Sequence, residues 1–257
     1  MVEPRPPRRT APRESAGPQR ATRPVRPPLK LQTTTLWHYP SGQYSDTPMG
    51  IPAYPGATPA WVIWNLLQRY TREKDLVVDP FCGGGTTLDV ARSLQRRALG
   101  YDLQPQRPDI FRADARKLPL EDSKADFVFM DPPYSTHIEY SGEEECIGGL
   151  DAFEPGYFEA MEAVFAECDR ILRDRRYFAI YVSDTYRKKR GFVPIGVILS
   201  GMLMKRFKPV DHIAVVRGNR KLDKPNYHKA AAEENFFLRG FQHLMIFKKE
   251  LSAPKAR

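Results

Sequence analysis

The chain has 257 residues, 41% of them hydrophobic, which suffices for one sizeable core and lies within the globular range. No apolar stretch approaches the roughly 20 residues of a membrane span, and residues 1–30 lack the apolar run of a signal peptide. The three cysteines form neither a paired framework nor a metal-ligand spacing, which favours a reducing cytoplasm: Cys82, Cys146 and Cys168.

The net charge of +9 lies mostly in residues 1–30, where eight basic and two acidic residues contribute +6. This Pro- and Arg-rich segment is predicted to be a disordered tail with polyproline II character. It either solubilises the chain or attracts a polyanion such as nucleic acid. Its eight prolines disfavour the amphipathic helix of an organelle transit peptide. Residues 251–257 are predicted to be a flexible end.

Order is predicted to begin near Leu31, with a short extended piece over 33–37 and an ordered loop over 38–57. A helix is expected to begin at Thr58 and Pro59. Thr58 would cap its N-terminus and Pro59 would occupy its first turn. The helix would continue to Tyr70, because apolar residues recur on one of its faces.

Short apolar runs that alternate with helical patterns predict the remaining elements. Strands are expected over 75–79, 98–102, 111–114, 125–130, 177–182, 212–216 and 244–247. Helices are expected over 86–97, 157–173 and 195–204. This alternation predicts an α/β fold in one domain over 31–250, a doubly wound, mostly parallel sheet with helices on both faces.

A Gly-rich turn follows the strand at 75–79 and precedes a helix, and its glycines would let a ligand approach the backbone closely. It lacks both the G-x-G-x-x-G spacing of dinucleotide sites and the Lys-Ser/Thr of phosphate loops. The ligand is therefore not expected to be held by its phosphates. Asp102 ends the next strand and could accept from both ribose hydroxyls. Asp114 ends the third strand and could reach an adenine amine.

The tetrapeptide Asp131-Pro132-Pro133-Tyr134 follows the buried strand at 125–130, and ligands bind at such strand ends in open α/β sheets. The two prolines lack N–H donors, so carbonyls and the Asp131 carboxylate are available as acceptors. The Tyr134 ring offers a face for stacking. The pattern suits a planar group that carries an amine, such as a nucleobase.

Together these motifs resemble those of the S-adenosylmethionine-dependent DNA amino-methyltransferases, which methylate adenine N6 or cytosine N4. The run 79–87 resembles the family's D-P-F-x-G-x-G-T-T cofactor loop, and Gly100-Tyr101-Asp102 resembles its ribose-binding acid. The segment 54–59 resembles the one that closes over the methionine end of the cofactor, although Tyr54-Pro55 stands where the family often has His-Pro. The resemblance covers residues 33–249 and implies a Rossmann-like methyltransferase fold that uses S-adenosylmethionine. The residues that it assigns to the cofactor are Thr58, Pro59, Asp79, Pro80, Phe81, Cys82, Gly83, Gly84, Gly85, Thr86, Thr87, Asp102 and Asp114.

The resemblance implies catalysis by the tetrapeptide on a base flipped out of double-stranded DNA. Tyr134 would stack on that base, while Asp131 and the Pro132 carbonyl accept its amine protons, and direct in-line transfer follows. No Pro-Cys pair exists, so carbon-5 methylation of cytosine is disfavoured and Cys82 is interpreted as a packing residue. Asp131 in the first motif position favours adenine N6. Cytosine N4, an RNA amine and a non-catalytic binding subunit are the alternatives.

Three short segments are candidates for DNA recognition: 135–156, 186–192 and 217–240. Basic residues in the last two are predicted to bind nucleic acid: Arg187, Lys188, Lys189, Arg190, Arg217, Arg220, Lys221 and Lys224. A solvated loop is the alternative for each segment taken alone. The small recognition region points to a short target sequence, a homodimer or a partner subunit. The resemblance also implies a protein of the cytoplasm that associates with the nucleoid and belongs to a restriction–modification system. His137, His212 and His228 have no ligand spacing, so no metal is expected.

Overall fold

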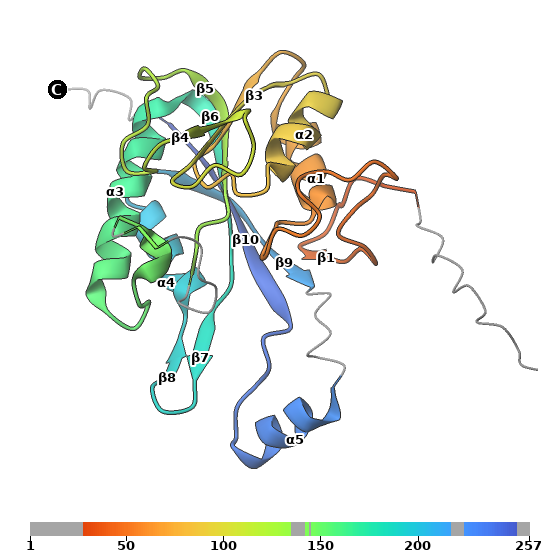
Figure 1. Cartoon of the computed structure of the whole chain (residues 1–257), viewed down its shortest axis with the longest axis vertical. Coiled ribbons are helices and arrows are strands. Elements are labelled where there is room, and N and C mark those ends of the chain that lie inside the picture. Colours follow the sequence, from red (N-terminus) through yellow and green to blue (C-terminus); the bar gives the residue numbers. More distant parts are fainter. Residues whose placement is uncertain (1–27, 135–141, 144, 217–223, 251–257) are drawn as a thin grey trace, which may run out of the picture.

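An eight-stranded sheet in the order β1-β9-β10-β6-β5-β2-β3-β4 forms the centre of the fold (Figure 1). The computed structural model describes residues 28–134, 142–143, 145–216 and 224–250. The strands are β1 Leu36–Trp37, β2 Leu76–Asp79, β3 Arg97–Asp102, β4 Ile110–Arg112, β5 Ala125–Met130, β6 Leu172–Val182, β9 Lys208–Val216 and β10 Phe241–Lys248. Neighbouring strands run parallel except at β10, which is antiparallel to both β6 and β9.

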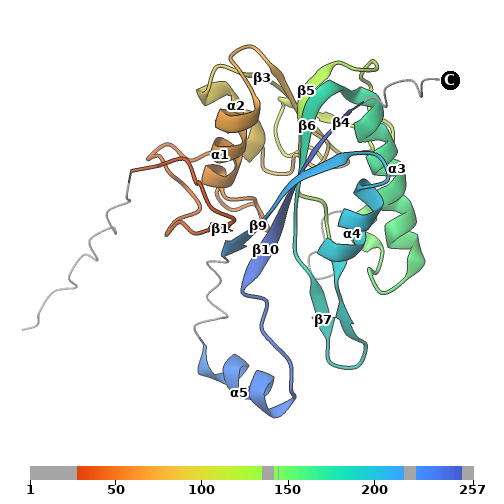
Figure 2. The same ribbon diagram turned by 180° about the vertical axis from the view of Figure 1, so that it is seen from behind.

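Helices cover both faces of this sheet (Figures 1 and 2). One face carries α1 (Ala60–Tyr70) and α2 (Thr86–Ser93), and the other carries α3 (Pro155–Ile171) and α4 (Ile195–Leu203). Side chains alternate between the two layers along each strand, so Phe127 packs toward α1 while Val128 packs toward α3. The predicted doubly wound α/β fold is confirmed. No helix in the described ranges is long and apolar enough to cross a membrane.

Several element bounds differ from the prediction. The helix expected over 86–97 ends at Ser93, because Gln95 adopts a left-handed conformation with φ of 62°. The chain then turns, and Arg97 begins β3 by donating its N–H to the Asp75 carbonyl. In the middle of the sheet, β6 begins at Leu172, directly after α3. The apolar pattern of the sequence marked these helices and strands clearly, but it did not mark the residues where each helix ends and the next strand begins.

The carboxyl ends of the parallel strands meet at one edge of the sheet. Met130 at the end of β5 lies opposite Ile180 in β6, and Asp79 at the end of β2 lies opposite Gly100 in β3. The glycine turn, the tetrapeptide and the chain that follows β6 therefore leave the sheet on the same side. The sequence placed each motif at a strand end, and the parallel register brings these ends together.

Two elements beyond this edge were not predicted. A β-hairpin forms from β7 (Thr185–Arg187) and β8 (Gly191–Val193), where 186–192 was expected to be a loop. A short helix, α5 (Pro225–Glu233), lies within the segment 217–240, which was also expected to be a loop. The hairpin and α5 protrude from the same side of the molecule (Figures 1 and 2). None of the α5 residues is buried, so core periodicity gave no signal for it.

Asp126 is a buried carboxylate that fixes the start of three neighbouring strands. Only 2% of the residue is exposed. Its Oδ2 accepts the Leu76 N–H at 2.9 Å, and its Oδ1 accepts from Arg173 at 2.8 Å and lies 3.1 Å from Nη2 of Arg176. One side chain in β5 thus holds the first residue of β2 and two arginines of β6.

We expect Asp126→Ala to lower the free energy of unfolding by about 2 kcal/mol, because it leaves the Leu76 N–H and the Arg173 guanidinium without their acceptor. Urea unfolding would measure the change. Asp122→Ala is the matched control, since Asp122 also pairs with an arginine but its side chain is 77% exposed. That variant should change stability by less than about 1 kcal/mol. Equal losses in both variants would contradict the role of Asp126.

Candidate active site

A cavity of about 860 Å³, its open mouth included, lies at the carboxyl edge beside β2, β3 and β5. Most of the predicted cofactor and catalytic residues line it: Thr58, Asp79, Pro80, Phe81, Cys82, Gly83, Gly84, Thr86, Thr87, Asp102, Asp114, Asp131 and Pro133. Pro59, Gly85, Pro132 and Tyr134 are adjacent in the chain but are not part of its wall. The two predicted sites, for a cofactor and for an amine-bearing group, therefore share one cavity.

Sequence reasoning missed part of the wall. Cys146 and Ile147 close the cavity from the start of a short 3-10 helix, η1 (Ile147–Gly149). They stand in an apolar doublet without a motif, far from the cofactor loop in sequence, so only the folded chain identifies them. Tyr54, Gly56 and Ala57 also line the cavity. They belong to the segment that resembles the family's closing segment.

The glycine turn is packed too tightly for any side chain. Gly83 and Gly85 have φ of 47° and 82°, which favour glycine. A Cβ on Gly84 would lie 2.8 Å from the Tyr54 Cβ, and one on Gly83 would lie 2.6 Å from the Tyr54 ring. The Ile51 N–H donates to the Gly84 carbonyl at 2.8 Å. The segment 43–59, called the strap below, thus lies directly on the glycine turn.

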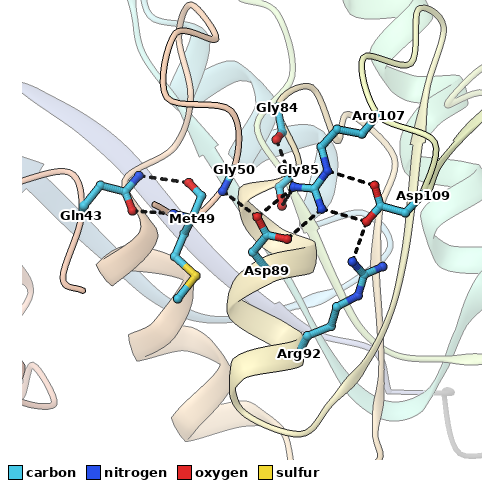
Figure 3. A network of polar contacts seen from close by, with 9 residues as sticks. All are labelled: Gln43, Met49, Gly50, Gly84, Gly85, Asp89, Arg92, Arg107 and Asp109. Atoms are coloured by element: carbon cyan, nitrogen blue, oxygen red, sulfur yellow. Dashed lines mark hydrogen bonds and ion pairs between the residues drawn. The ribbon is translucent and has the colours of Figure 1, made fainter. Parts of the chain in front are cut away.

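Arg107 and Asp89 connect the strap and the glycine turn to helix α2 (Figure 3). Nη1 and Nη2 of Arg107 donate to the two carboxylate oxygens of Asp89, each at 2.8 Å, and Nε donates to Asp109 at 2.9 Å. The Gly50 N–H donates to the same Asp89 carboxylate at 2.8 Å. A Cβ on Gly85 would lie 2.5 Å from Nη1 of Arg107. This network holds the start of α2 against the turn.

Four carboxylates line the cavity, and no lysine, arginine or histidine among the described residues does so: Asp79, Asp102, Asp114 and Asp131. Burial raises the pKa of Asp79 to about 7, although Thr87 and the Phe81 N–H oppose the shift, and the charge of Asp102 adds to it. The lining therefore favours a cationic ligand and disfavours a phosphate. This agrees with the absence of a phosphate loop in the sequence.

Asp102 and Asp114 already have partners within the chain. Asp102 accepts the Gly83 N–H at 2.8 Å through Oδ2 and the Gln104 N–H at 2.9 Å through Oδ1. Burial raises the pKa of Asp114, but contacts with the side chain and N–H of Arg116 outweigh it, so the pKa lies below its usual value. Both carboxylates are held in fixed positions and keep lone pairs for a ligand.

The tetrapeptide projects from the end of β5 beside the cofactor loop. Asp131 is partly exposed, both prolines are buried, and Tyr134 packs against the α3 side of the core. Oδ2 of Asp131 accepts the Thr58 hydroxyl at 2.5 Å. The prediction that Thr58 caps α1 is wrong. The helix begins at Ala60 with Pro59 in the cap position, because the Thr58 side chain binds Asp131 instead.

Cys82 has little space around it. A Cβ on Gly100 would lie 2.3 Å from the Cys82 Sγ, so β3 passes closely behind the cofactor loop. Burial raises the pKa of the Cys82 thiol, and the nearby Asp79 and Asp102 raise it further. The thiol therefore stays protonated and packs as a small apolar group, since a nucleophile would need the thiolate.

The basic residues predicted to bind nucleic acid lie away from this cavity. Arg187 and Arg190 of the hairpin pair with Asp151 at 2.7 and 2.8 Å and lie over the Phe153 ring. Lys188 pairs with Glu234, and Lys189 lies in the hairpin turn. Lys224 directly precedes α5. Arg217, Arg220 and Lys221 lie outside the described residues, as do 135–141 of the first recognition segment.

A model described as DNA methylase, of the N6/N4 methyltransferase type, matches residues 8–112 and 125–252. The chain belongs to this DNA methylase family. The family resemblance predicted from the cofactor loop and the tetrapeptide is thereby confirmed. No curated protein matches the chain.

Solved structures that resemble the chain include S-adenosylmethionine-dependent methyltransferases. One from Methanosarcina mazei shares 14% identity over 73% of this chain and 98% of its own, with a TM-score of 0.47. A candidate sarcosine dimethylglycine methyltransferase from Galdieria sulphuraria shares 13% over 74% and 81%, with a TM-score of 0.46. A candidate DNA modification methylase from Thermus thermophilus shares 18% over 56% and 54%, with a TM-score of 0.39.

We expect Gly84→Ala to weaken binding of S-adenosylmethionine about tenfold or more, because the new methyl group forces Tyr54 and the turn apart. Isothermal titration would measure the affinity. Gly42→Ala is the matched control, since Gly42 directly precedes the strap and a Cβ there meets nothing within 4 Å. Unchanged binding by Gly84→Ala would show that the close contact between Tyr54 and the turn does not matter.

Proposed function

We propose that this chain transfers a methyl group from S-adenosylmethionine to the exocyclic amine of a base in double-stranded DNA, with adenine N6 as the favoured atom. The observation that supports it most is that Asp131 lines the same cavity as the glycine turn and Asp102. A methyl donor held by the turn would thus lie beside an amine held by the tetrapeptide. Membership of the DNA methylase family supports DNA as the substrate.

The chemistry of the cavity fits the cofactor. S-adenosylmethionine supplies a methyl group activated by a sulfonium cation, and the acid-lined wall favours such a cation. Gly83 to Gly85 would let it approach the backbone, and Asp102 would accept from its ribose hydroxyls. Asp114 would accept from its adenine amine. Asp79, buried and partly protonated near neutral pH, would ionise as a cationic group approached.

The tetrapeptide would position the base. A base inside a duplex cannot reach the cavity, so it must leave the stack, and the Tyr134 ring would stack against it. Asp131 and the Pro132 carbonyl would accept the N–H protons of the amine and turn its lone pair toward the methyl group. Thr58 donates to Asp131 and fixes the direction of that carboxylate. The amine nitrogen would attack the methyl carbon as the sulfur leaves with the electron pair of the broken sulfur–carbon bond, and the Asp131 carboxylate would take the proton that the nitrogen releases.

Adenine N6 is preferred over cytosine N4 because the motif begins with Asp131, a preference that rests on the family pattern. Cytosine N4 is the alternative, because its amine could donate to the same two acceptors. An RNA amine and a role as a non-catalytic subunit are further alternatives. The protein would act on the DNA of the nucleoid in the cytoplasm, as a homodimer or with a partner subunit that enlarges its short recognition region.

The hairpin residues 187–190 and Lys224 would contact phosphates of the same duplex, because their elements protrude from the sheet edge that carries the tetrapeptide (Figures 1 and 2). Arg187 and Arg190 share the carboxylate of Asp151. Arg190 also pairs with Glu154, so the two guanidinium groups are balanced by two carboxylates, and a phosphate would bind them by displacing a carboxylate.

We expect DNA from cells that express the chain to contain N6-methyladenine, which nucleoside mass spectrometry would detect. Asp131→Ala should reduce transfer at least about a hundredfold, because it removes an acceptor that aligns the amine. Labelled S-adenosylmethionine would report the rate on DNA and on RNA, with cofactor affinity as the control for folding. N4-methylcytosine alone would overturn the preference for adenine, and methyl groups in RNA alone would overturn the proposal of a DNA substrate.

Cofactor affinity should depend on pH through Asp79. Its pKa of about 7 lies above the ordinary value of 3.8, so the folded chain holds the proton up to near neutral pH. A cationic ligand prefers the ionised form, so affinity should rise between about pH 5 and 7 and level off above it. The stability of the empty protein should fall over the same window, because the unfolded state ionises first. Asp79→Asn should flatten both profiles in titrations of the cofactor and of unfolding.

A further inference from the structure

A second cavity lies between the β7–β8 hairpin and the segment 235–241 that joins α5 to β10. Its empty volume, open mouth included, is about 920 Å³. None of its lining residues lines the first cavity. The wall consists of Asp184, Tyr186, Phe192, Asn235, Phe236, Phe237, Leu238, Arg239, Gly240 and Phe241.

Aromatic rings dominate this wall and remain accessible. Phe237 is 84% exposed, Phe192 49% and Phe241 45%. Tyr186 and Phe236 stack on each other with centroids 4.7 Å apart and planes within 15°. Exposed rings gathered around one cavity indicate a binding surface, because isolated chains seldom leave such a patch in water.

The wall of the cavity carries one guanidinium group, from Arg239, and one carboxylate, from Asp184. The Arg239 guanidinium lies 4.8 Å from the centre of the Phe192 ring and donates to the Phe237 carbonyl, a neutral partner, so it keeps its charge. Asp184 is the carboxylate of the wall. Its Oδ2 lies 3.0 Å from Nε2 of His243 and its Oδ1 accepts the Gly196 N–H at 3.0 Å, so it is already engaged.

The cavity belongs to the edge of the sheet that carries the tetrapeptide. Met130 and Ile180 are register partners in β5 and β6. Four residues later these parallel strands have led to Tyr134 and to Asp184. The base-binding tetrapeptide and the aromatic cavity therefore extend from neighbouring strands in the same direction.

We propose that this second cavity binds an unstacked nucleobase of the DNA substrate, separate from the target base. Planar rings next to a guanidinium bind bases by stacking and their phosphates by charge, with little dependence on sequence. A target base that leaves the duplex exposes neighbours that have lost a stacking partner, and the cavity would stabilise one of them. The inference rests on the proposed function of the first cavity. A protein helix would instead prefer an aliphatic groove without a central cation.

Phe192→Ala and Phe237→Ala test the inference, because both side chains are exposed and their loss leaves the core intact. Each should weaken DNA binding and raise the KM for DNA about tenfold, while affinity for S-adenosylmethionine is unchanged. Phe111→Ala is the matched control, since Phe111 is 51% exposed on β4 and lines neither cavity. A 2-aminopurine placed beside the target base is quenched while it stacks in the duplex, so its fluorescence should rise when the wild type draws it out of the stack and rise less with Phe237→Ala.

The outcomes separate this inference from the proposed function. If the wild type methylates DNA and both variants keep its KM for DNA and its rise in 2-aminopurine fluorescence, the second cavity takes no base and the inference is wrong. If the variants lose self-association but keep their DNA affinity, the cavity is an interface between copies, which also overturns it. If the wild type transfers no methyl group to DNA, the proposed function fails. Binding of a 2-aminopurine oligonucleotide then still decides whether the cavity takes a base.

Discussion

Burial of the sheet on both faces is the constraint on which the rest of the structure depends. Helices α1 and α2 cover one face and α3 and α4 the other, so the interiors of the central strands β2 and β5 are buried away from any ligand. In a parallel sheet the carboxyl strand ends then meet at one rim. Motifs separated by many residues in the sequence, such as the glycine turn and the tetrapeptide, become neighbours for this reason alone.

Charge is distributed unevenly along that rim. The cofactor cavity is lined by acids, while arginines and lysines lie on the hairpin and around α5. The separation suits two ligands of opposite charge, a cationic methyl donor inside and a polyanion outside. The ion pairs within the chain on the hairpin affect how strongly a polyanion would bind there. A phosphate would compete with Asp151 for Arg187 and Arg190, which limits the gain from each new contact.

Local sequence was sufficient for the core and insufficient for the periphery. The strand at 125–130 agrees with the prediction at both ends, because six consecutive buried residues leave a strong signal. Helix α5 buries nothing and η1 carries no motif, so neither had a pattern to detect. The glycine turn was recognisable in the sequence because Tyr54 and Arg107 lie so close to it that only glycine fits there, and three consecutive glycines are a visible pattern. The bond from Thr58 to Asp131 joins residues far apart in sequence, and capping preferences pointed to a different partner.

The strap has a thermodynamic consequence. It contacts the glycine turn through Ile51 and the Asp131 carboxylate through Thr58, and only a few residues of backbone join the two contacts. A ligand that shifts one contact therefore shifts the other. Coupling of this kind is reciprocal. If the bound cofactor changes the affinity of Asp131 for a base by some factor, the bound base changes the affinity for the cofactor by the same factor. The cofactor and the base would thus change each other's affinity by the same factor through the strap.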